Sequence, residues 1–109
     1  MKVRFLYFGG CPNAEPTLTL LKETLAAEVP DTDLECQEIN AGEEAVRYGF
    51  LGSPTIQIDG LDIEKERRKD PPFYGCRIYR TTQGSSGIPA KAMIIEAIVE
   101  ASQARHVFP

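Results

Sequence analysis

Three cysteines, Cys11, Cys36 and Cys76, carry the most reactive side-chain groups of this 109-residue chain. An odd number of cysteines at irregular spacing does not form a disulfide framework, so we expect free thiols and a reducing, cytoplasmic compartment. The single histidine, His106, has no partner at ligand spacing and is expected to be exposed near the end of the chain. No paired-histidine or glycine-rich phosphate motif is present. Thiol chemistry without a metal site or a cofactor is therefore expected.

Cys11 stands in the stretch GGCPNA, between an apolar run and a helical pattern. Gly9 and Gly10 lack Cβ atoms, which permits a sharp turn and the close approach of a partner to the sulfur. The unpaired N–H groups at the start of a helix, with their positive dipole end, stabilise a thiolate. Cys11 is therefore the candidate nucleophile. The alternative is a structural residue in a tight strand-to-helix turn.

Pro16 decides where the helix after Cys11 begins. If Cys11 were the N-cap, Pro16 would fall inside the helix and remove a hydrogen bond. If Asn13 is the N-cap, Pro16 falls at the third helical position, where a missing N–H costs nothing. We therefore expect the N-cap at Asn13, with Cys11 two residues before it.

Composition and charge exclude several classes of protein. The net charge is −4, whereas binding to nucleic acid or to an anionic membrane needs a basic face. No stretch reaches the roughly 18 apolar residues of a membrane span, and the apolar run of the N-terminus is too short for a signal peptide. Residues 64–70, EKERRKD, mix both signs and predict a solvated loop.

The hydrophobic pattern predicts a single α/β domain over residues 1–109. Strands are expected at residues 2–8, 33–40, 53–60 and 76–81, helices at 14–28, 42–49 and 89–103, and an irregular loop at 61–75. The predicted element order is β-α-β-α-β-β-α. With its first βαβ unit right-handed, this order closes as a four-stranded mixed sheet with helices on both faces.

The two remaining cysteines are expected to lie apart from Cys11. Cys36 falls in the middle of a strand, where a buried, inert thiol is expected. Cys76 opens the last predicted strand and should lie at the opposite edge from Cys11. Bridged cysteines need Cα atoms within about 7 Å, and a six-residue strand covers roughly 20 Å. A disulfide between Cys11 and Cys76 would require the 61–75 loop to fold back.

The element order, GGCPNA after the first strand and GSPT at residues 52–55 together resemble a thioredoxin-fold protein over nearly the whole chain. The resemblance implies that Cys11 is the active cysteine and that Pro54 is cis and lies against it. It also implies a thiol or disulfide substrate, either a protein or a low-molecular-weight thiol. The residues that the resemblance implies to contact this substrate are Gly10, Pro12, Ser53, Pro54 and Thr55.

One residue departs from the thioredoxin pattern. Ala14 stands where the family has its second cysteine, so no disulfide forms within the motif and Cys11 is expected to act as a monothiol. An alternative reading is a thioredoxin-fold binding module that has lost the chemistry, because a fold does not fix function.

A further resemblance concerns a little-characterised bacterial thioredoxin-like group sometimes labelled alkylmercury lyase. The stretches GGCPN, LGSPT and CRIYRT carry this resemblance. It implies soft-metal or organomercurial handling by two thiols and an acid, which here would be Cys11, Cys76 and Asp62. Thiolates favour such metals, so this function remains a second alternative.

Overall fold

The structure is a computed structural model that describes residues 1–106, with side chains as far as Ala104. The side chain of His106 therefore lies outside the described part. The helices are α1 (Ala14–Glu28), α2 (Gly42–Tyr48), α3 (Lys91–His106) and a short 3-10 helix (Lys65–Arg67). The strands are β1 (Lys2–Tyr7), β2 (Asp33–Glu38), β3 (Leu51–Ser53), β4 (Thr55–Ile58), β5 (Leu61–Asp62), β6 (Phe73–Cys76), β7 (Tyr79–Thr81) and β8 (Gly84–Ser86).

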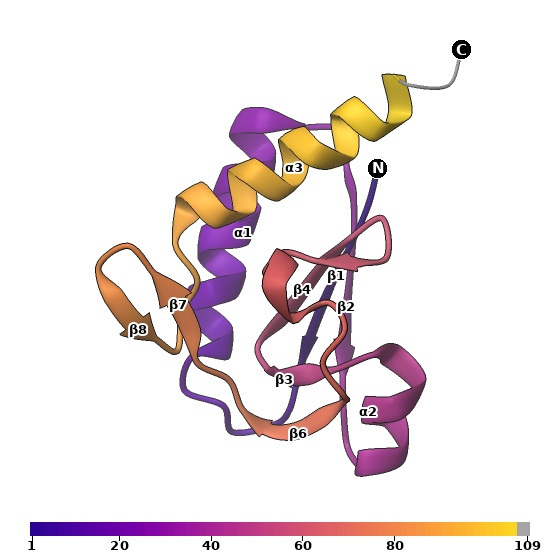
Figure 1. The fold of residues 1–109 in the computed structure, drawn as a ribbon, viewed down its shortest axis with the longest axis vertical. Helices are drawn as coiled ribbons and strands as arrows, with labels where there is room; N and C mark the ends of the chain where they lie inside the picture. Colours follow the sequence, from indigo (N-terminus) through magenta and orange to yellow (C-terminus); the bar gives the residue numbers. More distant parts are fainter. Residues whose placement is uncertain (107–109) are drawn as a thin grey trace.

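A mixed four-stranded sheet forms the centre of the fold, as predicted (Figure 1). Its strand order is β2-β1-β4-β5, with β1 parallel to β2 and antiparallel to β4. Phe5 pairs with Cys36 on one side and with Ile56 on the other, which fixes the register. Two small sheets, β3 with β6 and β7 with β8, complete the structure.

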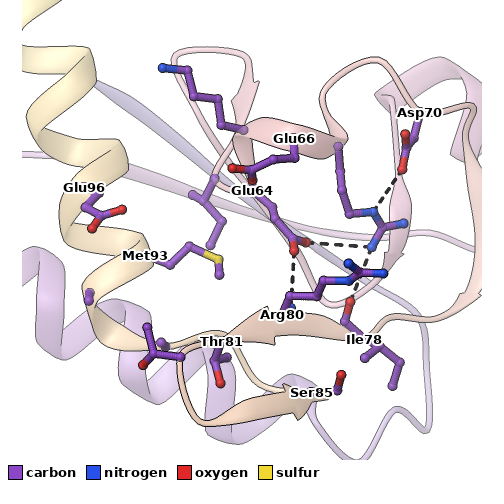
Figure 2. Close-up of a pocket in the computed structure, with 15 residues that line it drawn as sticks. Glu64, Glu66, Asp70, Ile78, Arg80, Thr81, Ser85, Met93 and Glu96 are labelled. Carbon is purple, nitrogen blue, oxygen red and sulfur yellow. Dashed lines mark hydrogen bonds and ion pairs between the residues drawn. The ribbon is translucent and has the colours of Figure 1, made fainter.

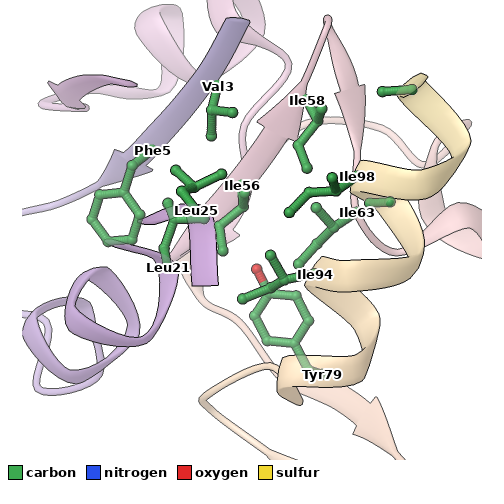
Figure 3. Close-up of a cluster of buried hydrophobic side chains, with 12 residues drawn as sticks. Val3, Phe5, Leu21, Leu25, Ile56, Ile58, Ile63, Tyr79, Ile94 and Ile98 are labelled. Carbon is green, nitrogen blue, oxygen red and sulfur yellow. The ribbon is translucent and has the colours of Figure 1, made fainter. Parts of the chain in front are cut away.

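The alternation of β1 divides the apolar side chains between the two faces of the sheet. Val3 and Phe5 lie in the main cluster with α1 and α3 (Figure 3), whose buried members also include Leu21, Leu25, Ile56, Ile58, Ile63, Tyr79, Ile94, Ala97, Ile98 and Ala101. Leu6 belongs to a second cluster with Ile39, Ala45 and Phe50, which α2 covers. Helices therefore cover both faces. Burying each large aliphatic side chain stabilises the fold by about 1.5–3 kcal/mol.

The helix boundaries confirm two local predictions. Asn13 is the N-cap residue of α1, although its side chain makes no capping hydrogen bond. Helix α2 ends at Gly49, which adopts a left-handed conformation with φ of 68°, and the N–H of Phe50 donates to the carbonyl of Ala45. This arrangement satisfies the last carbonyls of α2 and turns the chain into β3.

The prediction for residues 61–81 is wrong in two respects. The fourth strand of the main sheet is β5, and the predicted strand 76–81 is divided between β6 and β7. The division falls at Arg77 and Ile78: β6 pairs with β3 and β7 pairs with β8, whereas the Arg77 side chain is buried in an ion pair with Asp62. The predicted 61–75 loop contains β5, the 3-10 helix and the start of β6.

Two predictions of exposure are also wrong. Residues 64–70 are not simply solvated, because Glu64 is buried and Arg68 makes two hydrogen bonds, of 2.9 and 2.7 Å, to Glu100 on α3. Cys36 is exposed rather than buried, because β2 is an edge strand with its side chains largely in solvent.

No helix within residues 1–106 combines the length and apolar character that crossing a bilayer requires.

Candidate thiol site

Cys11 lies in the turn that joins β1 to α1. Its N–H donates to the carbonyl of Phe8 at 3.4 Å, and its own carbonyl accepts from the N–H of Ala14 at 3.3 Å. Gly10 has φ of +82°, a conformation that side chains rarely adopt, so this tight turn depends on glycine. The turn leaves Cys11 partly exposed, two residues before the N-cap of α1.

The Ser53–Pro54 peptide bond is cis, as the resemblance implies, and this loop lies against Cys11. The Cys11 Sγ donates to the carbonyl oxygen of Ser53 at 3.8 Å. The Ser53 hydroxyl in turn accepts from the N–H of Phe8 at 3.2 Å. Two contacts therefore join the Cys11 turn to the loop that follows β3.

The side chains of Ser53 and Thr55 are buried, so any contact of these two residues with a substrate uses backbone groups. Both residues are fully buried, and Pro54 is buried between them. The Thr55 hydroxyl donates to the carbonyl of Gly52 at 2.6 Å and accepts from the N–H of Leu51 at 3.2 Å. The Thr55 hydroxyl therefore makes its hydrogen bonds to backbone groups of the protein. Gly10 and Pro12, by contrast, are exposed beside Cys11.

Cys76 lies next to the loop and not at the opposite edge, which corrects the topological prediction. Strand β6 runs parallel to β3 with Cys76 opposite Ser53 (Figure 1). The N–H of Arg77 donates at 3.1 Å to the same Ser53 carbonyl oxygen that faces the Cys11 thiol. The reason is that residues 61–75 cross back and return the chain alongside β3. Cys76 is exposed.

Gly52 permits this close packing of β6 on β3. Its φ is +104°, and an added Cβ would lie 3.0 Å from the Cβ of Arg77 and 3.1 Å from the carbonyl oxygen of Gly75. A glycine at this position therefore lets two backbones approach where any side chain would force them apart. The proximity of Cys76 to Ser53 depends on this contact.

Aromatic side chains line the region beside β6. Tyr74 contacts the rings of Phe8 and Phe50, with centroids 5.6 and 6.4 Å apart. Phe73, Tyr74 and Ile78 are 51, 46 and 56% exposed, so this surface is unusually apolar. Exposed apolar side chains therefore lie close in the chain to Cys76, on and just after β6.

The Asp62 carboxylate is paired with Arg77. Two hydrogen bonds of 2.8 and 2.7 Å join the two side chains, and a third, of 3.1 Å, joins Arg77 to Glu64. Among the side chains described, which end at Ala104, no group of three or more His, Cys, Asp and Glu is arranged to hold a metal ion. The acid expected for organomercurial chemistry is therefore already engaged.

The sequence reasoning missed this buried cluster of Arg77, Asp62, Glu64 and Tyr79. Burial alone would lower the pKa of Arg77, but hydrogen bonding to Asp62 and nearby negative charge raise it above its ordinary value. Burial also raises the pKa of Tyr79 well above its usual range. Arg77 is therefore charged and Tyr79 protonated at physiological pH. Within CRIYRT no local pattern signals that one arginine is buried, since its acidic partners lie 13 and 15 residues earlier.

One cavity of the described structure lies away from Cys11 and Cys76. It has a volume of about 900 Å³ and lies between the 3-10 helix, the β7–β8 hairpin and the start of α3 (Figure 2). Glu64, Arg80, Thr81 and Met93 line it, whereas neither Cys11 nor Cys76 belongs to its described lining. Cys11 and Cys76 are therefore separate from this cavity.

Comparison of the chain with protein-family models, with curated proteins and with solved structures found no significant match.

Proposed function

We propose that this is a thioredoxin-like thiol protein in which Cys11 is the nucleophile of thiol–disulfide exchange. The single observation that carries the proposal is the position of Cys11. It is partly exposed at the start of α1, and its Sγ lies 3.8 Å from the carbonyl oxygen of Ser53, next to a cis proline. Helix starts stabilise thiolates, and a thiolate is the form that attacks.

The first step joins the protein to its substrate. The Cys11 thiolate attacks one sulfur of a substrate disulfide, forming a mixed disulfide and releasing the other substrate sulfur as a thiolate. Exposed Gly10 and Pro12 leave room for the substrate on the solvent side of Cys11. A disulfide on a protein, or on a low-molecular-weight thiol, meets these requirements.

The position of Cys76 supports a second step. The Cys76 thiolate attacks the Cys11 sulfur of the mixed disulfide, forming a bond between Cys11 and Cys76 and releasing the remaining substrate thiolate. The substrate disulfide is then fully reduced, and the protein has lost two electrons. Because Cys76 lies opposite Ser53, it replaces the motif cysteine that is absent at Ala14.

The same two thiols favour a second candidate function, the binding of a soft metal ion or an organomercurial. Thiolates are the preferred ligands of such metals. Asp62 contributes nothing here, because its carboxylate is held by Arg77. Soft-metal binding would therefore use Cys11 and Cys76 alone.

Trapping of the mixed disulfide tests the proposal and separates it from a non-catalytic module. The reduced protein is incubated with glutathione disulfide, and the adducts are located by mass spectrometry of the digest. We expect glutathione on Cys11 in the Cys76→Ser variant and its release in the wild type. The Cys36→Ser variant, which lacks a surface thiol on β2, serves as the control. A binding module without chemistry would give equal, slow labelling at Cys11 and Cys36.

A further inference from the structure

The buried side chain of Arg77 has an unusual set of partners. It is 1% exposed and donates to both oxygens of Asp62, to Glu64 and, at 3.3 Å, to the Thr55 hydroxyl. Its guanidinium lies over the ring of Tyr79, 4.1 Å from the centroid. Three charges and one aromatic ring are thus packed together beneath the loop that contains Pro54.

Stability alone does not account for this cluster. A buried ion pair is often no more stabilising than apolar side chains of similar volume, because desolvation offsets the attraction. The Arg77 Nε is buried without a hydrogen-bond partner among the described atoms, which adds a further cost. We therefore ask which neighbouring groups the cluster holds in place through its hydrogen bonds.

The partners of the cluster within the loop indicate that role. Arg77 donates its backbone N–H to the Ser53 carbonyl, Tyr79 donates its hydroxyl to the Pro54 carbonyl, and Arg77 donates Nη1 to the Thr55 hydroxyl. Three consecutive residues of the loop thus each accept a hydrogen bond from Arg77 or Tyr79. The first of these acceptors is the carbonyl that faces the Cys11 thiol.

We propose that Arg77 and Tyr79 are positioning residues, which hold the Ser53–Pro54–Thr55 loop so that the Ser53 carbonyl stays against Cys11. The proposal rests on the proposed function of Cys11 and adds the groups that set the geometry of its site. A carbonyl oxygen accepts an S–H hydrogen bond and disfavours a thiolate beside it. Arg77 and Tyr79 therefore set how closely this carbonyl approaches the Cys11 Sγ, and freeing the loop should make Cys11 more reactive.

Tyr79→Phe is the direct test, because it removes only the hydroxyl and keeps the ring beneath Arg77 and within the main cluster. The readout is the pH profile of Cys11 alkylation, measured by mass spectrometry with Cys36 in the same sample as an internal reference. We expect the profile to move to lower pH, because a freed loop no longer holds the Ser53 carbonyl oxygen against the Cys11 Sγ. Thr55→Val removes the hydrogen bond from Arg77 together with those that join the Thr55 hydroxyl to Leu51 and Gly52, and it should move the profile in the same direction.

Tyr48→Phe is the matched control, since Tyr48 lies on α2 outside the cluster. An unchanged profile in folded Tyr79→Phe and Thr55→Val proteins, or a move to higher pH, would overturn the positioning role. The result is separable from the proposed function. The wild-type reactivity of Cys11 tests its role as the nucleophile, whereas the difference between wild type and variants tests positioning.

Discussion

Cys76 lies opposite Ser53 in the parallel pairing of β6 with β3, and the carbonyl of Ser53 faces the Cys11 thiol. Ser53 thus pairs through its backbone with one cysteine and contacts the thiol of another that is 65 positions away in the chain. This relationship places two cysteine residues next to Ser53 in a protein without a Cys-x-x-Cys motif.

Mild oxidation should join these two thiols. We expect diamide treatment to give a Cys11–Cys76 disulfide, because Cys76 pairs with Ser53, whose carbonyl oxygen faces the Cys11 Sγ. Such a bridge needs Cα atoms within about 7 Å. Mass spectrometry of the non-reduced digest identifies the pairing. Cys36→Ser should leave the product unchanged, and Cys76→Ser should abolish it. Bridges that involve Cys36 at similar yield would contradict the proposed two-thiol site.

Removal of the Arg77 guanidinium should destabilise the fold strongly. Arg77→Met leaves the buried carboxylates of Asp62 and Glu64 without their main partner, which costs about 3–5 kcal/mol of unfolding free energy. Urea denaturation measures the loss. Arg80→Met is the control, because this exposed side chain makes none of the described ion pairs and its loss should stay within about 0.5 kcal/mol. Equal losses of unfolding free energy in the two variants would show that the buried ion pairs of Arg77 do not contribute more to stability than an exposed arginine.

Two glycines with positive φ should differ in their tolerance of alanine. Gly10→Ala places a Cβ in open space and should cost only the left-handed backbone conformation, about 1–2 kcal/mol. Gly52→Ala adds a collision with Arg77 and Gly75, so its cost should exceed that of Gly10→Ala by about 1–3 kcal/mol. Thermal and urea unfolding compare the two variants. Similar losses would mean that β6 is not held closely against β3.

The ion pair between Arg68 and Glu100 should make stability depend weakly on pH. The hydrogen bond from Arg68 lowers the pKa of Glu100 below its ordinary value of 4.5. A lowered carboxyl pKa stabilises the fold above 4.5, and this contribution is lost as the pH falls through the folded-state value. Because the Glu100 side chain is 38% exposed, solvent screening limits the contribution to less than about 1 kcal/mol.

Glu100→Gln tests this contribution. The variant should be slightly less stable than the wild type at pH 7, and the difference should close under acid conditions. Glu96→Gln, an exposed residue on the same helix, should show no such convergence. A Glu100→Gln difference that persists unchanged in acid would rule out the ion pair as its cause.

Local features of the sequence were sufficient to predict the first half of the fold. Pro16 permits only one favourable start for α1, and the alternation of Val3, Phe5 and Leu6 predicts a strand covered on both faces. The exposure of Cys36 was missed because whether a strand lies at an edge depends on the rest of the sheet. Local pattern does not contain that information.

The second half of the fold depends on contacts that are distant in sequence. The pairing of β6 with β3 has few residues and a register shift, so periodicity does not reveal it. Likewise, the burial of Arg77 follows from acidic partners on and beside β5, and no motif joins them. The candidate nucleophile was identified from its own neighbourhood, whereas Cys76 and the positioning residues became visible only in three dimensions.

Site-resolved alkylation of the reduced, native protein tests the central claim most directly. Cys11 and Cys36 are compared in one sample at pH 7 with iodoacetamide, and the modified peptides are counted over time by mass spectrometry. Cys36 is the more exposed thiol and sets the rate that accessibility alone permits. An activated Cys11 should react at least roughly fivefold faster than Cys36, because the start of α1 stabilises its thiolate. A Cys11 that reacts at the rate of Cys36 or more slowly would contradict its role as the nucleophile.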